Sequence, residues 1–170
     1  MTIRVLVADD QAMIRGALAG LLDLESDIEV VAQAADGAQA LEELARLASA
    51  DASTRASAPV DVAIIDVEMP RMDGITATQA IRSRFPGVRV LIVTTFGRPG
   101  YLQRALDAGA TGFMVKDAPV EALSDGVRTV AAGGRAIDQS LALEALSAGS
   151  SPLTDREADV LREVEGGGTI

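Results

Sequence analysis

The stretch "DVAIIDVEMPRMDG", residues 61–74, joins a buried strand directly to a carboxylate. Residues 62–65 are all apolar, as in a strand that is covered on both faces, and the run ends on the acid Asp66. An ionised side chain at the end of a buried strand is costly unless a partner or a ligand compensates its charge. We therefore expect Asp66 to belong to a functional site.

Similar apolar runs, separated by amphipathic segments, extend over most of the chain. The apolar runs lie at 3–8, 28–35, 60–66, 88–95 and 111–115, and the amphipathic segments at 11–24, 37–48, 74–84, 99–108 and 119–132. Continuous apolar runs that alternate with helical segments are typical of a parallel sheet. Because five such units are too few for an eight-stranded barrel, the sequence predicts an α/β, flavodoxin-like, doubly wound sheet of five parallel strands in the order 2-1-3-4-5.

The composition excludes several classes of function. The 170 residues include no cysteine and no histidine, which excludes disulfides, thiolate chemistry, the usual zinc sites and histidine-dependent catalytic triads. The net charge of −10 argues against a general nucleic-acid-binding surface. Because no apolar run approaches the ~20 residues of a membrane span, we expect a cytoplasmic protein that does not insert into membranes.

Acidic residues follow two strands that would be neighbours in this sheet. Asp9 and Asp10 follow the first apolar run, and Asp66 ends the third. In the predicted order the chain reverses direction between these strands, so their carboxyl ends line one crevice. Three adjacent carboxylates repel one another unless a cation lies between them. Mg²⁺ is the natural candidate, because it prefers oxygen ligands.

Hydroxyl and ammonium groups follow the next two strands. Thr94 and Thr95 end the fourth strand, and Lys116 follows the fifth. Beside a metal-bound carboxylate, such groups can hold the oxygens of a phosphoryl group while the carboxylate attacks phosphorus. The sequence therefore suggests Asp66 as a nucleophile. Taken singly, each residue also has a structural interpretation, because aspartate caps helices, threonine favours strands and an isolated lysine is usually solvated.

Over residues 1 to about 130 the sequence resembles the receiver domains of two-component response regulators, which have a CheY-like fold. The resemblance lies in the acids at 9–10, in "IIDVEMPRMDG" with Pro70 and Gly74, in Thr94, and in "GFMVKD" with Lys116. It implies that Asp66 accepts a phosphoryl group from a sensor histidine kinase. It also implies that Thr94 and Lys116 contact the phosphoryl oxygens.

The resemblance further implies a metal site and switch residues. Asp9, Asp10, Asp66 and the backbone carbonyl of Glu68 would bind Mg²⁺, with Asp10 the more direct ligand and Asp9 acting through water. The Glu68 side chain is either a solvated loop acid or a group at the site entrance that tunes hydrolysis of the acyl phosphate.

Two further positions belong to the switch that the resemblance implies. Thr95 occupies the small position that shapes access to the site. Phe113 occupies the aromatic position that rotates inward when the hydroxyl of Thr94 moves toward the phosphoryl group. Simple core packing is the alternative explanation for Phe113.

Beyond the receiver-like part, 1–132, the chain changes character. Residues 49–59 look like a flexible surface loop, and 133–152 like a linker with a short helix at 138–148. In 153–170, "PLTDREADVL" contains a capping box and resembles the start of the LuxR-type helix-turn-helix domain of the NarL/FixJ family. We expect that domain to be incomplete here. Residues 94–119 are especially similar to the DesR-like branch.

Together these features predict a response regulator and not an enzyme that turns over substrate. Phosphorylation would favour a homodimer, and a full-length helix-turn-helix domain, unlike this chain, would bind promoter DNA. Candidate dimer surfaces are the first and fifth helices, or the fourth helix with the fifth strand and helix. Ala12, Met13, Leu123 and Val127 could belong to the former, and core packing explains some of these four residues equally well. The alternatives are a Mg²⁺-dependent aspartyl-phosphate phosphohydrolase, with Glu68 as general acid, and a stand-alone receiver acting through protein contacts.

Overall fold

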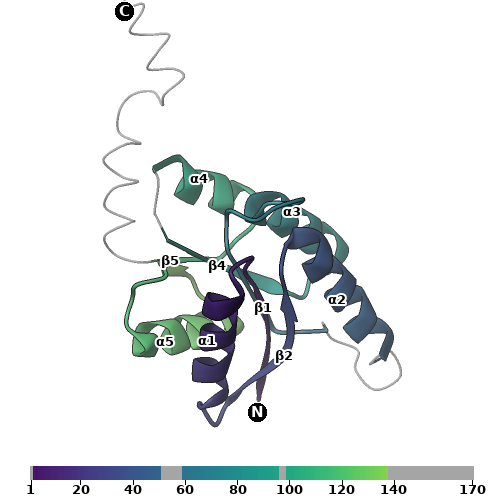
Figure 1. The fold of residues 1–170 in the computed structure, drawn as a ribbon. Coiled ribbons are helices and arrows are strands. Elements are labelled where there is room, and N and C mark those ends of the chain that lie inside the picture. Colours follow the sequence, from purple (N-terminus) through teal and green to yellow (C-terminus); the bar gives the residue numbers. More distant parts are fainter. Residues whose placement is uncertain (1, 51–58, 96–98, 138–170) are drawn as a thin grey trace, which may run out of the picture.

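A computed structural model describes residues 2–50, 59–95 and 99–137 (Figure 1). In this part of the chain, strands and helices alternate from β1 to β6. The strands are β1 (Ile3–Ala8), β2 (Ile28–Ala34), β3 (Val62–Ile65), β4 (Arg89–Thr94), β5 (Gly112–Val115) and β6 (Ala136–Ile137). The helices are α1 (Ala12–Asp23), α2 (Gly37–Ala50), α3 (Gly74–Arg84), α4 (Pro99–Asp107) and α5 (Val120–Ala131).

All pairs of neighbouring strands are parallel, and the sheet order is β2-β1-β3-β4-β5-β6. The predicted doubly wound sheet and its order 2-1-3-4-5 are therefore confirmed. The sheet has one strand more than predicted, because β6 pairs with β5 after the turn at 132–135. Gly133 has a φ of 97°, which side-chain-bearing residues rarely adopt, and this glycine lets the chain turn back from α5 toward the sheet.

The apolar runs are continuous because both faces of the sheet are covered. Along β3, Val62 and Ile64 face the core that α1 and α5 close, while Ala63 and Ile65 face the core formed with α2, α3 and α4. Figure 1 shows α1 and α5 together on one side of the sheet and the other three helices on the opposite side. Successive side chains of a strand point to opposite faces of the sheet, but both faces are covered by a core with fully buried branched side chains. Strand β3 is therefore apolar at every position and does not alternate between apolar and polar residues.

The loop 67–73 folds back against the backbone of Asp66. The amide of Gly74 donates a hydrogen bond to the carbonyl of Val67 (2.8 Å), and Asp73 caps α3 by accepting from the amide of Thr76 (2.7 Å). A Cβ at position 74 would lie 2.0 Å from the carbonyl oxygen of Asp66, so only glycine fits there. The start of α3 thus fixes the backbone at the end of β3.

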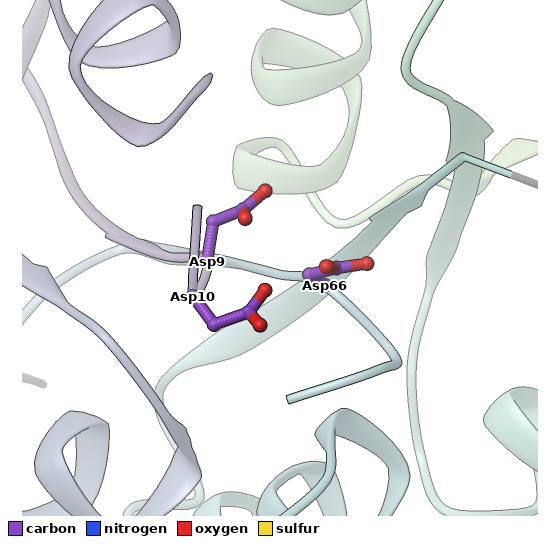
Figure 2. Close-up of side chains that lie close together, drawn as sticks. All are labelled: Asp9, Asp10 and Asp66. Atoms are coloured by element: carbon purple, nitrogen blue, oxygen red, sulfur yellow. The ribbon is translucent and has the colours of Figure 1, made fainter. Parts of the chain in front are cut away.

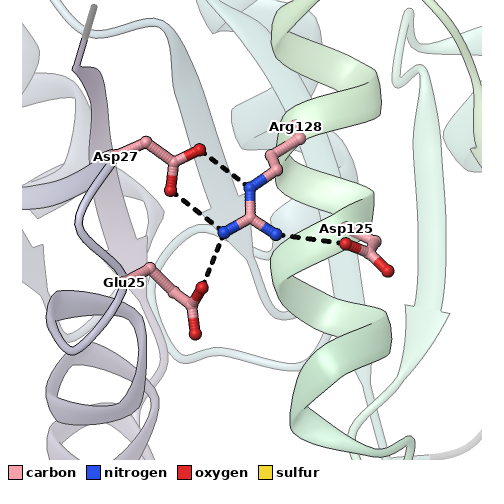
Figure 3. A network of polar contacts seen from close by, with 4 residues as sticks. All are labelled: Glu25, Asp27, Asp125 and Arg128. Carbon is pink, nitrogen blue, oxygen red and sulfur yellow. Dashed lines mark hydrogen bonds and ion pairs between the residues drawn. The ribbon is translucent and has the colours of Figure 1, made fainter.

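An arginine in α5 connects that helix to the loop between α1 and β2. The guanidinium of Arg128 bonds to Asp27 (2.8 and 3.0 Å), Glu25 (2.6 Å) and Asp125 (3.1 Å), as Figure 3 shows. These hydrogen bonds raise the pKa of Arg128 above its usual value and, through the bond to Arg128, lower that of Asp27. The network holds the two helices on this face of the sheet in a fixed relation.

The fold decides one sequence-based expectation about the dimer surface and leaves three others untested. Leu123 and Val127, offered as dimer-surface residues, are buried in the core against the sheet, because the apolar face of α5 is the face that covers β3 and β4. The loop 49–59, the helix at 138–148 and the segment 153–170 lie largely or wholly outside the described residues. Within the described ranges, no helix is long and apolar enough to cross a membrane.

Candidate functional site

The three acids singled out in the sequence meet at the carboxyl edge of the sheet. Asp9 and Asp10 follow β1, Asp66 follows β3, and these two strands are hydrogen-bonded neighbours. The amide of Asp66 extends their ladder by donating to the carbonyl of Ala8 (3.0 Å). One carboxylate oxygen from each acid lies within 4.8 Å of the others (Figure 2). The strand order therefore brings together residues more than fifty positions apart.

Lys116 completes the cluster from the end of β5. Its amide donates to the carbonyl of Thr94 (2.8 Å), which continues the pairing of β4 with β5. Its ammonium lies 2.6 Å from Asp9 Oδ2 and 3.2 Å from Asp66 Oδ2. This ion pair is the contact that the structure gives to the buried Asp9 Oδ2, which makes no hydrogen bond of good geometry among the described residues.

The cluster stabilises the charge of Lys116 but not that of Asp66. Burial is the main cause that raises the pKa of Asp66, and the charge of Asp9 adds to it, while Lys116 only partly offsets the rise. Burial by itself would lower the pKa of Lys116, but its close contact with Asp9 and the charges of both acids outweigh burial and raise it. The lysine is thus firmly ionised, and the site is short of positive charge.

A pocket of about 350 Å³ opens above the acids. Its walls are made by Asp10, Gln11, Asp66, Glu68, Thr94, Thr95 and Lys116. The structure therefore brings together most of the predicted site residues. Asp9 lies buried beside Lys116, and Phe113 is fully buried in the core in β5, paired with Ile92 of β4. The switching role of Phe113 stays a prediction.

Two residues at the site were not found by sequence analysis. Gln11 lines the pocket, and its position directly after the paired acids is the signal that could have indicated it. Tyr101 of α4 donates a hydrogen bond from its hydroxyl to Glu68 Oε2 (2.9 Å). These two residues are 33 positions apart, on a helix and a loop, and no local pattern in the sequence connects them.

The sheet order, the three carboxylates and the lysine at one edge define the class of receiver domains. The family model for the "Response regulator receiver domain" matches residues 5–128, and the chain belongs to this family. The chain is 39% identical over 165 residues to the transcriptional regulatory protein DesR of Bacillus subtilis, covering 97% of this chain and 76% of DesR. The uncharacterised transcriptional regulatory protein YvfU of the same organism is 38% identical over 160 residues, covering 94% and 74%.

Solved structures agree with this assignment. A LuxR-family two-component response regulator from Aurantimonas has a TM-score of 0.74 at 28% identity, over 86% of this chain and 97% of that one. The receiver domain of the putative regulator NarL from Mycobacterium tuberculosis has a TM-score of 0.68 at 34% identity, over 78% and 98%. The protein is therefore a two-component response regulator of the LuxR/NarL type, as the resemblance in the sequence implied.

Proposed function

We propose that Asp66 is the residue at which this response regulator is phosphorylated, by a sensor histidine kinase. The observation that carries the proposal is the placement of the Asp66 carboxylate in the pocket, close to two further acids and 3.2 Å from the ammonium of Lys116. A carboxylate oxygen of Asp66 would attack phosphorus, forming a P–O bond as the P–N bond of the kinase phosphohistidine breaks. Lys116 and Thr94 would hold the phosphoryl oxygens, and exposed Thr95 would limit the space beside them.

The same residues fit a bound Mg²⁺. One carboxylate oxygen of each of the three acids lies within 4.8 Å of the others, and Oδ2 of Asp9 is buried without a hydrogen bond to any described residue, in an ion pair with Lys116. Oxygen ligands of this kind suit Mg²⁺, and we assign it to Asp9, Asp10, Asp66 and the backbone carbonyl of Glu68. When bound, Mg²⁺ supplies positive charge that offsets the charge of the transferred phosphoryl group.

We further propose that phosphorylation favours a homodimer and thereby controls a LuxR-type helix-turn-helix domain that binds promoter DNA. Exposed apolar side chains at the start of α1 and just after its end support the first of the two candidate surfaces. Met13 is 86% exposed and Leu24 80% exposed, and Ala12 is also on the surface. Because Leu123 and Val127 are buried, the contribution of α5 to such a surface must come from other residues. The cytoplasmic location stays a prediction.

The test is the intact mass and sedimentation of the protein after incubation with Mg²⁺ and a small acyl phosphate, beside Asp66→Asn. We expect one added phosphoryl group and a shift toward dimer for the wild type alone. Lys116→Ala should be phosphorylated without the shift, because the phosphoryl group would lack its ionic partner. If Asp66→Asn still gains a phosphoryl group, another residue is the acceptor. Steady turnover of phosphate monoesters would indicate a phosphohydrolase instead.

A further inference from the structure

The loop 67–73, which carries Glu68, is attached to the rest of the domain at its base and at its tip. At the base, the amide of Gly74 bonds to the carbonyl of Val67 (2.8 Å). At the tip, the carbonyl of Met72 accepts from the amide of Gly37, the first residue of α2 (3.1 Å). The loop is thus suspended between its own strand and the start of a helix on the α2 side of the sheet.

An ion pair reinforces the attachment at the tip. The guanidinium of Arg71 donates to Asp36 Oδ2 through Nε (2.8 Å) and also through its terminal Nη2. The other oxygen of Asp36 accepts from the amide of Gln39 (2.8 Å) in the first turn of α2. Asp36 is 0% exposed, whereas the side chain of Arg71 is 70% exposed. A buried carboxylate with both oxygens engaged is a rigid anchor for a loop.

The charge of Asp36 is stabilised despite its burial. Burial raises the pKa of this carboxyl, but the amide of Gln39 and the side chain and charge of Arg71 outweigh burial and lower the pKa below its usual value. Asp36 is therefore ionised at neutral pH and attracts the guanidinium permanently.

The backbone of Arg71 is in a conformation that arginine seldom adopts. Among the residues that the structure describes, it alone combines a side chain with a positive φ, 64°. Glycine or asparagine would satisfy this conformation more easily. An arginine side chain that reaches a buried acid from such a position offsets the backbone penalty, so the pair and the loop conformation support each other.

We propose that Arg71 and Asp36 are positioning residues for the phosphorylation site: their ion pair holds in place the loop whose Glu68 carbonyl would be a Mg²⁺ ligand. This inference rests on the proposed function, in which that carbonyl is a Mg²⁺ ligand. Partners that orient a metal ligand, when removed, usually weaken metal affinity by about 10–100-fold. Loss of the pair should therefore lower the affinity for Mg²⁺, and it should leave the rate of Asp66 phosphorylation unchanged once Mg²⁺ is saturating.

The test compares Arg71→Gln with wild type by calorimetric titration of Mg²⁺ and by the rate of phosphorylation from an acyl phosphate at graded Mg²⁺. We expect Mg²⁺ affinity to fall about tenfold, at the low end of that range, because the guanidinium ties the loop that carries the ligand to Asp36 and does not contact the ligand itself. The rate should fall at low Mg²⁺ and recover at saturating Mg²⁺. Arg71→Lys, which keeps the charge, should restore part of the affinity.

Two further variants separate the ion pair from general effects. Arg71→Gly removes the ion pair, but glycine suits the positive φ at this position. The variant should therefore fold well and yet have the same reduced Mg²⁺ affinity as Arg71→Gln. Arg46→Gln removes an equally charged, exposed partner of Glu43 on α2 and should bind Mg²⁺ as the wild type does. If Arg71→Gln and Arg71→Gly keep wild-type affinity, the positioning role is wrong while the proposed function stands. If the wild type itself neither binds Mg²⁺ nor accepts phosphoryl, both fail.

Discussion

Gly74 provides the sharpest test of how the acceptor residue is held. In Gly74→Ala the added Cβ would lie 2.0 Å from the carbonyl oxygen of Asp66, 2.8 Å from its carbonyl carbon and 2.9 Å from Cα of Val67. All three neighbours are backbone atoms, which cannot rotate away as a side chain can. Either the end of β3 or the first turn of α3 must move by about 1 Å to relieve the contact.

The expected cost follows from this geometry. Overpacking in a core usually costs about 1–3 kcal/mol, and we expect a value near the upper end, about 3 kcal/mol, because only backbone can yield. For a domain of this size that corresponds to a fall in the melting temperature of roughly 10 °C. The displaced Asp66 should also be phosphorylated more slowly, because its carboxylate moves away from Lys116 and from the other two acids.

The assay is thermal and urea unfolding of Gly74→Ala beside Gly16→Ala. Gly16 is exposed in the middle of α1, and a Cβ there would meet nothing within 4 Å. The control should therefore be stabilised, by up to about 1 kcal/mol from helix propensity alone. If Gly74→Ala melts within a degree or two of the wild type, the close packing of the loop against the acceptor backbone is wrong.

Three other expectations concern the charges and the loop of the site. Burial raises the pKa of Asp66 in the folded state, so its ionisation opposes folding at neutral pH, and this cost is relieved as the pH falls through the raised pKa. Without Mg²⁺, Asp66→Asn should therefore have a higher melting temperature in calorimetry than the wild type. A lower melting temperature would contradict a destabilising charge at Asp66. Tyr101→Phe frees the Glu68 carboxylate to orient an attacking water. The phosphorylated protein should therefore lose its phosphoryl group a few fold faster, well below the ~100-fold effect of a dedicated general base. An unchanged half-life, measured by intact mass, would argue against a role for the bond between Tyr101 and Glu68. Arg128→Gln should lower the free energy of unfolding at neutral pH. Its difference from the wild type should shrink as the pH falls through the lowered folded-state pKa of Asp27, because the pair of Arg128 with Asp27 stabilises the fold only while Asp27 is ionised. A difference in stability that persists in acid would indicate that Arg128 acts through packing instead.

The site was predictable where it depends on backbone topology. A parallel sheet places the ends of its strands at one edge, so Asp9, Asp66 and Lys116 could be brought together from the order of the strands alone. The contact between Tyr101 and Glu68 could not, because it depends on the rotation of α4 and on the path of a loop, and neither is encoded in a local pattern.

The remaining differences in the fold also have physical reasons. The apolar period of α5 marks one face of the helix but does not say whether that face meets the sheet or a second molecule, and for Leu123 and Val127 it meets the sheet. The strand β6 has only two residues, too few for any periodic signal, and it depends on the turn that Gly133 makes possible.

That short strand also affects how the domain can be handled once it is separated from the rest of the chain. In β6, the amide of Ala136 donates to the carbonyl of Thr111 (3.0 Å), and Ile137 pairs with Phe113. The outer edge of β5 is therefore covered by a paired strand. A fragment cut at residue 132 would leave those peptide groups bare, and a bare edge strand is a template on which neighbouring molecules add strands and aggregate. Fragments that keep residues 133–137 should therefore remain dispersed at concentrations where the shorter ones precipitate.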